Sequence, residues 1–167
     1  MSRTADGMLP YRDSVFVNFS NGTYQWVHMK LFGLSVEVDD ASALACLLKS
    51  SYYRDGYCGP EARNCGVLHG PYVIEQMRVS DFVATNAADA SAELRGWAEY
   101  YWKLDDQQRE ELELQVYSRM RRATAVYRLA RLPKDRRADY EINFHFTEFV
   151  LLDREASELA LVVGTDD

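Results

Sequence analysis

The chain contains only three cysteines and four prolines, and it has no long apolar run. An odd cysteine count does not suggest the paired disulfide framework of a small secreted domain. No stretch approaches the about 20 apolar residues of a membrane-spanning helix, and residues 1–13 contain no signal-peptide core. We therefore predict a soluble, cytoplasmic protein with no membrane association.

The sequence also lacks the short motifs that mark several large enzyme families. It has no G-x-x-x-x-G-K phosphate loop, no G-x-G-x-x-G dinucleotide loop, no G-x-S-x-G elbow and no H-E-x-x-H zinc motif. These absences argue against the families that the motifs define. They leave open whether the protein is an enzyme of another kind.

The residues that are present suit a globular protein. The chain has 167 residues, of which 47% are hydrophobic and 27% are charged, and a typical domain holds about 100–200 residues. We expect a single domain over residues 1–167, with residues 1–13 as a flexible lead-in. The net charge of −7 opposes general nucleic-acid binding and favours a basic partner.

Two strands are predicted near the N-terminus. Residues 14–19 are rich in β-branched and aromatic side chains, and Asn21-Gly22 is typical of a two-residue hairpin turn. Residues 23–32 form the second strand, with Val27, Met29 and Leu31 on one face. Residues 34–38 either extend that strand or form a third short one.

A helix and an irregular segment follow. Asp39 and Asp40 are good N-cap residues for a helix that reaches about Tyr53. Residues 54–71 contain four glycines and two prolines, and they predict a long loop of the kind that is often functional. The segment 72–82 has both strand and turn features.

The clearest predicted unit is an antiparallel helical hairpin between residues 87 and 132. Asp105 can cap its second helix, with Gln108 at the reciprocal position, and Pro133 ends it. The apolar residues of the second helix recur at helical spacing. They are Leu112, Val116, Met120, Ala123, Tyr127 and Ala130.

The C-terminal part returns to strands. Apolar and polar residues alternate over 140–147, residues 150–152 are expected beyond a bulge or bend, and residues 159–163 form a last strand after a turn at 153–157. Strands at both ends with helices between them predict the α+β class. We expect an antiparallel sheet from the N- and C-terminal strands, packed against a central antiparallel helical hairpin plus one further helix.

The 54–71 loop holds the best candidates for chemistry. Cys58, Cys65 and His69 are zinc-ligand types, although their spacing is not that of a standard zinc knuckle. A fourth ligand would have to come from elsewhere in the chain. A reversible Cys58–Cys65 disulfide is an alternative, and ordinary loop cysteines, with no cofactor, are the favoured interpretation. The candidates for the fourth zinc ligand are Cys46, His28 and His145.

A cysteine nucleophile is a related hypothesis. Cys58 or Cys65 could act with His69 as the base and with Asn64 or Glu61 as the orienting group. Catalytic triads usually gather from distant parts of a chain, so this local crowding favours a plain loop over a catalytic site.

His145 lies on the polar face of its predicted strand, beside Glu141, Asn143 and Thr147. Such a face either lines a pocket or meets water, and the solvated interpretation is favoured. A partner for His145 across the sheet, such as His28, would favour the pocket.

Eight basic residues lie between Arg119 and Arg137, and Asp135 is the one acidic residue among them. They could form a docking patch for phosphate, nucleic acid or an acidic protein. On a helix they would spread around its circumference, so we expect internal pairing with the acidic surplus.

Two functions follow from these patterns. The first is a small interaction protein of the inhibitor, immunity or adaptor kind, which binds a protein partner through an exposed patch that includes Tyr52, Tyr53, Tyr57 and Tyr72. The second is an enzyme or ligand-binding domain, with zinc or a redox-active thiol pair as further candidates, in which the 54–71 loop covers a sheet pocket. Its four candidate residues, Cys58, Cys65, His69 and His145, would then converge on one cleft. A homo-oligomer is a further alternative.

Overall fold

A six-stranded antiparallel sheet forms the centre of the computed structural model, which describes residues 8–19, 24–55, 57, 67–137 and 145–166. The sheet joins strands from both ends of the sequence with two strands from its middle, and β8, the last in sequence order, lies between β2 and β7. In spatial order the strands are β1 (Tyr11–Asn18), β2 (Gln25–Gly33), β8 (Glu158–Asp166), β7 (Phe146–Asp153), β6 (Ala125–Leu129) and β5 (Phe82–Thr85).

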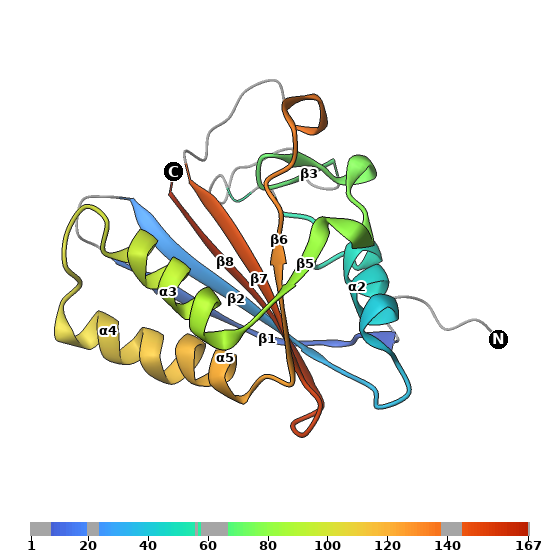
Figure 1. Ribbon diagram of the computed structural model, residues 1–167, viewed down its shortest axis with the longest axis horizontal. Helices are drawn as coiled ribbons and strands as arrows, with labels where there is room; N and C mark the ends of the chain where they lie inside the picture. The colour runs from blue at the N-terminus through green and yellow to red at the C-terminus, as the bar shows by residue number, and fades with distance from the viewer. Residues whose placement is uncertain (1–7, 20–23, 56, 58–66, 138–144, 167) are drawn as a thin grey trace.

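Helices cover both faces of this sheet (Figure 1). One face carries α3 (Ala87–Ala98) and an antiparallel partner made of α4 (Asp106–Leu112), a π-helical turn (Glu113–Tyr117) and α5 (Ser118–Arg122). The other face carries α2 (Asp40–Lys49) and a small hairpin of β3 (Leu68–His69) and β4 (Tyr72–Val73). The predicted α+β class, with a helical hairpin and one further helix, is confirmed.

Three short 3-10 turns complete the described elements. Ile74–Gln76 and Val79–Asp81 lie between β4 and β5, and Lys134–Arg136 follows β6. Among the described residues, no helix has the length and apolarity that crossing a membrane would require.

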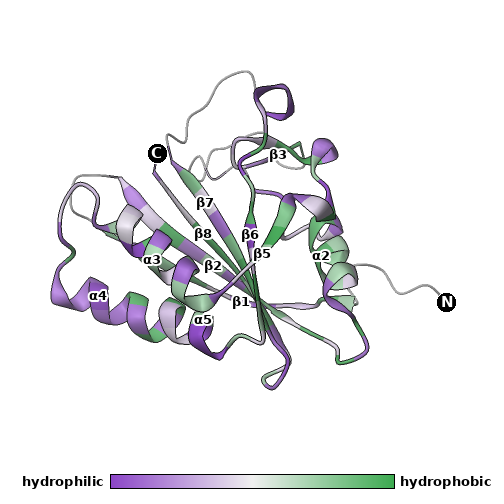
Figure 2. Cartoon of the chain, in the orientation of Figure 1, coloured by the Kyte–Doolittle hydropathy of each residue, from purple (hydrophilic) through white to green (hydrophobic). Residues whose placement is uncertain are grey.

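Strand alternation divides the buried residues into two clusters, one on each face of the sheet. Val27, Met29 and Leu31 share one face of β2, as predicted, and they pack under the helical hairpin together with Leu94 of α3. Phe32 and the residues of α2 lie in the opposite cluster. In Figure 2 the strands carry both hydrophobic and hydrophilic residues, whereas α4 is mainly hydrophilic.

The N-terminal hairpin is confirmed, with β1 and β2 paired in antiparallel register. Its Asn21-Gly22 turn lies outside the described residues. The expected strand at 34–38 is wrong, because this stretch forms a turn that leads into α2. Asp39 caps α2, since its carboxylate accepts a 2.7 Å hydrogen bond from Ser42 N. The helix ends at Lys49 and not at Tyr53.

The second helix of the hairpin is shorter than predicted. Asp105 caps α4 by accepting from Gln108 N at 2.8 Å, as expected. The helical path then ends at Arg122, and residues 125–129 form β6 where a helix up to Pro133 was predicted. The reason lies in the tertiary structure, because β6 gains backbone partners on both sides, from β5 and from β7.

The C-terminal strands are longer and more regular than predicted. β7 pairs with β8 without interruption from Phe146–Thr165 to Asp153–Glu158, so the bulge expected before residue 150 is wrong. The turn at 154–157 and the last strand are confirmed. Residues 138–144, which include most of the predicted alternating stretch, lie outside the described residues.

Candidate functional site

A cavity of about 250 Å³ lies where β6 and β7 separate. The two strands are paired only as far as Arg128–Phe149. Beyond that point, residues 146–148 of β7 keep β8 as their neighbour, while Ala130 N donates to Asp81 O on the β5 side. Figure 1 shows the two strands diverging toward the end of the sheet at which β7 begins. We name this cavity the β6–β7 cleft.

Three arginines and one carboxylate line the β6–β7 cleft. The carboxylate, Glu93 of α3, accepts from both Nε (2.8 Å) and Nη2 (2.7 Å) of Arg128, and Thr147 Oγ1 also donates to it. The hydrogen bonds from the guanidinium raise the pKa of Arg128. Glu93 is therefore neutralised by Arg128.

The other two arginines belong to the segment after β6. Arg131 is exposed. Arg137 donates from Nε to Leu132 O at 2.8 Å, and its guanidinium carbon lies 6.0 Å from the centre of the Tyr72 ring. A backbone bridge between Tyr72 and Arg137 holds this segment against β4. The lining of the cleft thus gathers three guanidinium groups around the carboxylate of Glu93.

His145 also lines the β6–β7 cleft, and its ring bonds to Asp166 of β8. Asp166 accepts from His145 N at 2.8 Å and from Nδ1 at 2.9 Å. Because the carboxylate accepts, Nδ1 carries the hydrogen, and Nε2 remains for another partner. His145 and Thr147 thus border the cleft, while the His145 side chain remains 48% exposed, so water still reaches this face as the favoured interpretation has it. Glu141 and Asn143 lie outside the described residues.

His28 is not the partner of His145. It lies on β2 opposite Phe16 and Val163, and β8 separates it from β7. Burial, with a smaller effect from the Lys30 ammonium, lowers the pKa of His28.

A buried polar cluster lies on the α2 face of the sheet and consists of Tyr53, His69 and Glu148. Tyr53 Oη donates to Glu148 Oε2 at 2.7 Å, and His69 Nδ1 donates to the carbonyl oxygen of Tyr53 at 2.5 Å. His69 Nε2 meets Glu148 Oε1, and the rings of Tyr53 and His69 stack at 3.6 Å. Both side chains of the His69–Glu148 pair are fully buried.

This geometry fixes the protons of His69. A carbonyl oxygen can only accept, so Nδ1 must carry a hydrogen. One further proton lies between Nε2 and Oε1, and the pair is neutral overall whichever atom holds it. Neither ring nitrogen is then available to bind zinc or to act as the base for a cysteine, so the roles predicted for His69 do not fit.

The other residues of the predicted loop site are not brought together in the described structure. Cys58, Cys65, Glu61 and Asn64 lie outside the described residues. His69 is buried in the polar cluster, whereas His145 lies at the β6–β7 cleft. Among the described residues, no three His, Cys, Asp or Glu side chains gather as a metal site would require.

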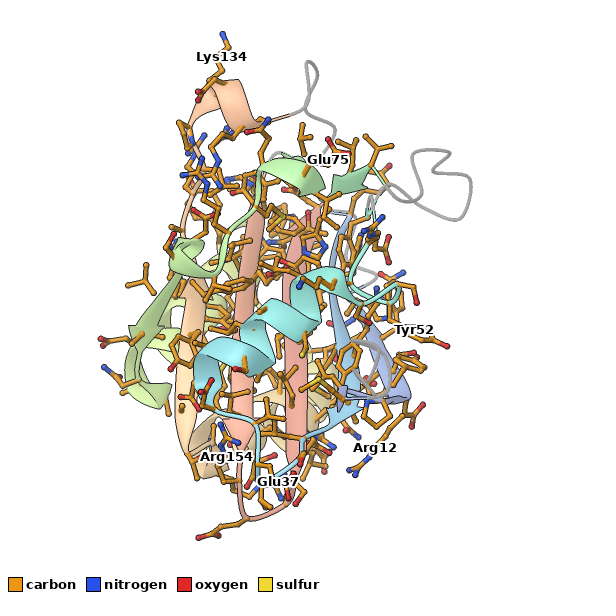
Figure 3. The ribbon with its side chains drawn as sticks, turned by 90° about the vertical axis from the view of Figure 1, so that its right-hand side faces the viewer. Arg12, Glu37, Tyr52, Glu75, Lys134 and Arg154 are labelled. Carbon is orange, nitrogen blue, oxygen red and sulfur yellow. The ribbon has the colours of Figure 1, made fainter. Side chains whose placement is uncertain are left out.

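The predicted tyrosine patch is wrong as an exposed surface. Tyr53, Tyr57 and Tyr72 are buried, and burial raises the pKa of each phenol. Tyr52 alone is exposed, and it stacks on Tyr11 at 4.2 Å. Figure 3 shows Tyr52 beyond the end of α2, beside the β1 edge of the sheet.

The exposed aromatic residues lie instead in the loop between α3 and α4. Tyr100, Tyr101 and Trp102 are 72%, 48% and 65% exposed, and we name them the aromatic tip. The aromatic tip was not predicted from the sequence, because Tyr101 fits the helical spacing of a core residue. The signal was available, since three consecutive aromatic residues cannot all face the core side of one helix.

The eight basic residues between Arg119 and Arg137 were expected to pair with acidic residues of the chain. Four of them pair with acidic side chains elsewhere in the chain, which supports internal pairing over a single docking patch. The pairs are Arg119–Glu158, Arg121–Glu113, Arg128–Glu93 and Arg136–Asp81.

The chain matches no family model, no curated protein and no solved structure.

Proposed function

We propose that this chain is an interaction protein of the inhibitor, immunity or adaptor kind, and that it binds a protein partner with a basic surface through the aromatic tip. The observation that carries the proposal is the exposure of Tyr100, Tyr101 and Trp102 at consecutive positions. Tyrosine and tryptophan are the side chains that most often dominate binding energy at protein interfaces. Three of them facing water together mark a binding surface more strongly than single exposed apolar residues.

The backbone beneath the aromatic tip is fixed on both sides. Leu104 is buried under the loop, and its N–H donates to Glu99 Oε1. On the other side, Gln25 Nε2 donates to Trp97 O at 2.7 Å. An anchored loop loses little conformational entropy on binding, and this favours a stable complex.

Charge supports a basic partner. Residues 99–113 contain six acidic and two basic side chains. Glu99 and Glu113 pair with arginines. Asp106, Glu110 and Glu111 form no ion pair with any described residue, so the helix next to the tip is acidic. Acidic flanks steer a basic surface toward the aromatic residues.

The test uses a photo-crosslinking amino acid placed at position 102 or at position 52 of the full chain, in the source cells. Tyr52 is the matched comparison, because it is as exposed as Tyr101, at 48%. We expect a crosslink to one protein from position 102 and none from position 52. The purified pair should then bind at least about tenfold more weakly with Tyr101→Ala or Trp102→Ala than with Tyr52→Ala.

Raising the salt concentration should slow association of the pair, because rim charges act mainly on the association rate. Equal loss of binding in the Tyr52→Ala and Trp102→Ala variants would overturn the assignment to the aromatic tip. A crosslinked product of two copies of this chain would replace the basic partner with a homo-oligomer.

A further inference from the structure

We propose that the groove between the two helices of the hairpin receives an apolar side chain of the basic partner, with a lysine or arginine of that partner beside Glu110. This inference rests on the proposed function and extends it from the aromatic tip to the neighbouring helices. A cavity of about 370 Å³ lies in this groove, and we name it the hairpin pocket. Its apolar lining consists of Ala98, Leu104, Leu112 and Tyr117.

The first argument is the size and the apolar character of the hairpin pocket. All four residues of the apolar lining are buried in the fold. Burial raises the pKa of the Tyr117 phenol, so this ring adds no charge to the lining. Ala98 contributes only a methyl group, which leaves space beside α3. Pockets that hold small apolar groups have volumes of about 300–1,000 Å³, so the hairpin pocket can take one aliphatic or aromatic side chain.

The second argument is the backbone that forms one wall of the hairpin pocket. The π-helical turn Glu113–Tyr117 supplies both of its end residues to the lining. Turns of this kind are rare, and they lie frequently at functional sites. Arg95 of α3 fixes the turn, because its Nη2 donates to Glu113 Oε2 at 3.0 Å and its guanidinium carbon lies 4.3 Å from the centre of the Tyr117 ring. A wall that is already in place loses little conformational entropy when a partner binds.

The third argument is the charge at the rim of the hairpin pocket. Three arginines are held there by two carboxylates, in the pairs Arg95–Glu113, Arg121–Glu113 and Arg109–Glu99. Two guanidinium groups share Glu113, so that end repels a further cation. Glu110 also lines the pocket, and its carboxylate binds no described residue. It precedes Glu113 on the helix and lies nearer to the aromatic tip, so a basic group of the partner is attracted to the tip end of the pocket.

The fourth argument is the continuity of the hairpin pocket with the aromatic tip. The loop that carries the tip lies between Glu99 and Leu104, and both residues line the pocket. Figure 1 shows this loop at the end of the hairpin where α3 leads into α4. A partner seated on the tip therefore lies beside the pocket. Binding energy at protein interfaces concentrates where an anchor side chain fills such a pocket.

The test titrates the full chain, without a partner, with three probes that share one alkyl chain: hexylammonium, hexanol and hexanoate. The methyl resonances of Leu104 and Leu112 report on the hairpin pocket, and those of exposed Leu114, which does not line it, are the control. We expect the two pocket leucines to shift saturably with hexylammonium at a Kd of about 1 mM, while Leu114 stays in place. Hexanol should bind about threefold more weakly, because it forms no ion pair with Glu110, and hexanoate should bind more weakly than hexanol.

Glu110→Lys is the decisive variant, and Glu111→Lys is its matched control, because Glu111 carries the same charge on the same helix but does not line the pocket. Glu110→Lys should weaken hexylammonium binding about tenfold, and Glu111→Lys should weaken it less than about twofold. Both variants should leave hexanol binding unchanged. Equal effects of the two variants, or hexanoate binding as tight as that of hexylammonium, would overturn the proposal. Shifts of Leu104 and Leu112 that follow the chain concentration without a probe would place a second copy in the pocket and would also overturn it.

The partner captured from position 102 separates this inference from the proposed function. Hexylammonium should compete with that partner, and Glu110→Lys should weaken partner binding about tenfold. A partner that binds through the aromatic tip but responds neither to hexylammonium nor to Glu110→Lys would overturn the hairpin pocket alone. Saturable hexylammonium binding without any partner at position 102 would instead overturn the proposed function, while the affinity of the pocket for an apolar cation stood.

Discussion

Glu148 and His69 share a hydrogen bond with no solvent contact, although 79 positions separate them in the sequence. Glu148 also accepts from Tyr53 Oη, so one carboxylate of β7 holds two residues of the segment between α2 and β4. This segment includes the β3–β4 hairpin, and the hairpin borders the β6–β7 cleft through Tyr72. Removal of the Glu148 side chain should therefore also disturb the β3–β4 hairpin and the wall of the cleft that Tyr72 forms.

We expect Glu148→Ala to lower the free energy of unfolding by about 3–5 kcal/mol, because it leaves His69 buried without its partner. Urea denaturation measures this change. Glu75→Ala, at an exposed glutamate that Figure 3 labels, is the control and should change stability by less than about 0.5 kcal/mol. A loss below about 1 kcal/mol for Glu148→Ala would contradict the structural role of the pair.

Substitution by alanine should lower the stability of the fold at Gly70 and raise it at Gly96. Gly70 has a φ of +53°, and a Cβ there would lie less than 3.0 Å from the ring of Phe146. Gly70→Ala should destabilise the fold and displace the Phe146 wall of the cleft. Gly96 lies inside α3 with open space around it, so Gly96→Ala should stabilise by about 0.5–1 kcal/mol. Thermal unfolding of both variants would show whether the signs differ as expected.

His28 should make stability fall as the solution becomes acidic. Burial lowers its pKa below the ordinary 6.5, so the unfolded chain binds a proton at higher pH than the folded chain. The stabilisation is complete above pH 6.5 and is lost as the pH falls through the lower folded value. Urea denaturation gives the free energy of unfolding at about pH 8 and about pH 5. Between these two pH values, this free energy should fall less for His28→Gln than for the unaltered chain. Equal losses would mean that other groups carry the dependence.

Tyr127 should lose its hydroxyl proton at a higher pH than an ordinary tyrosine. Its hydroxyl donates to Asp40 Oδ2 at 2.7 Å, and this hydrogen bond, together with burial, raises its pKa to about 12. The stabilisation is present below pH 10 and is lost as the pH rises through about 12. NMR of ring-labelled tyrosine would follow this titration, and Asp40→Asn should move the pKa down toward 10. An unchanged value in that variant would remove Asp40 as the cause.

The elements with a long run of apolar residues on one face could be predicted from the sequence. The β1–β2 hairpin and the last strand followed from alternation, and α2 followed from its Asp39 cap. β6 could not be found in this way, because the apolar residues of a five-residue strand also fit helical spacing. Residues 125–129 form a strand and not a helix because they pair with β5 and β7, and this pairing depends on residues that are distant in the sequence.

The sites were harder to predict than the fold. Residues such as His69 and His145 were singled out by chemical type, but their roles depend on which strand each one meets. Glu148 shares its strand face with Phe146, Val150 and Leu152, and a glutamate on such a face could have signalled a buried partner. The β6–β7 cleft exists because two neighbouring strands separate, and no local pattern encodes that separation.

The place of β8 between β2 and β7 has a consequence for biosynthesis. Residues 25–33 and 146–153 pair with residues 158–166, so a nascent chain in which β8 is not yet made leaves two central strands with open backbone edges. The isolated β1–β2 hairpin is marginal in water, and such edges attract other chains. Contacts between such distant segments also slow folding. Completion of the sheet therefore waits for β8, and until then the backbone edges of β2 and β7 stay open to other chains.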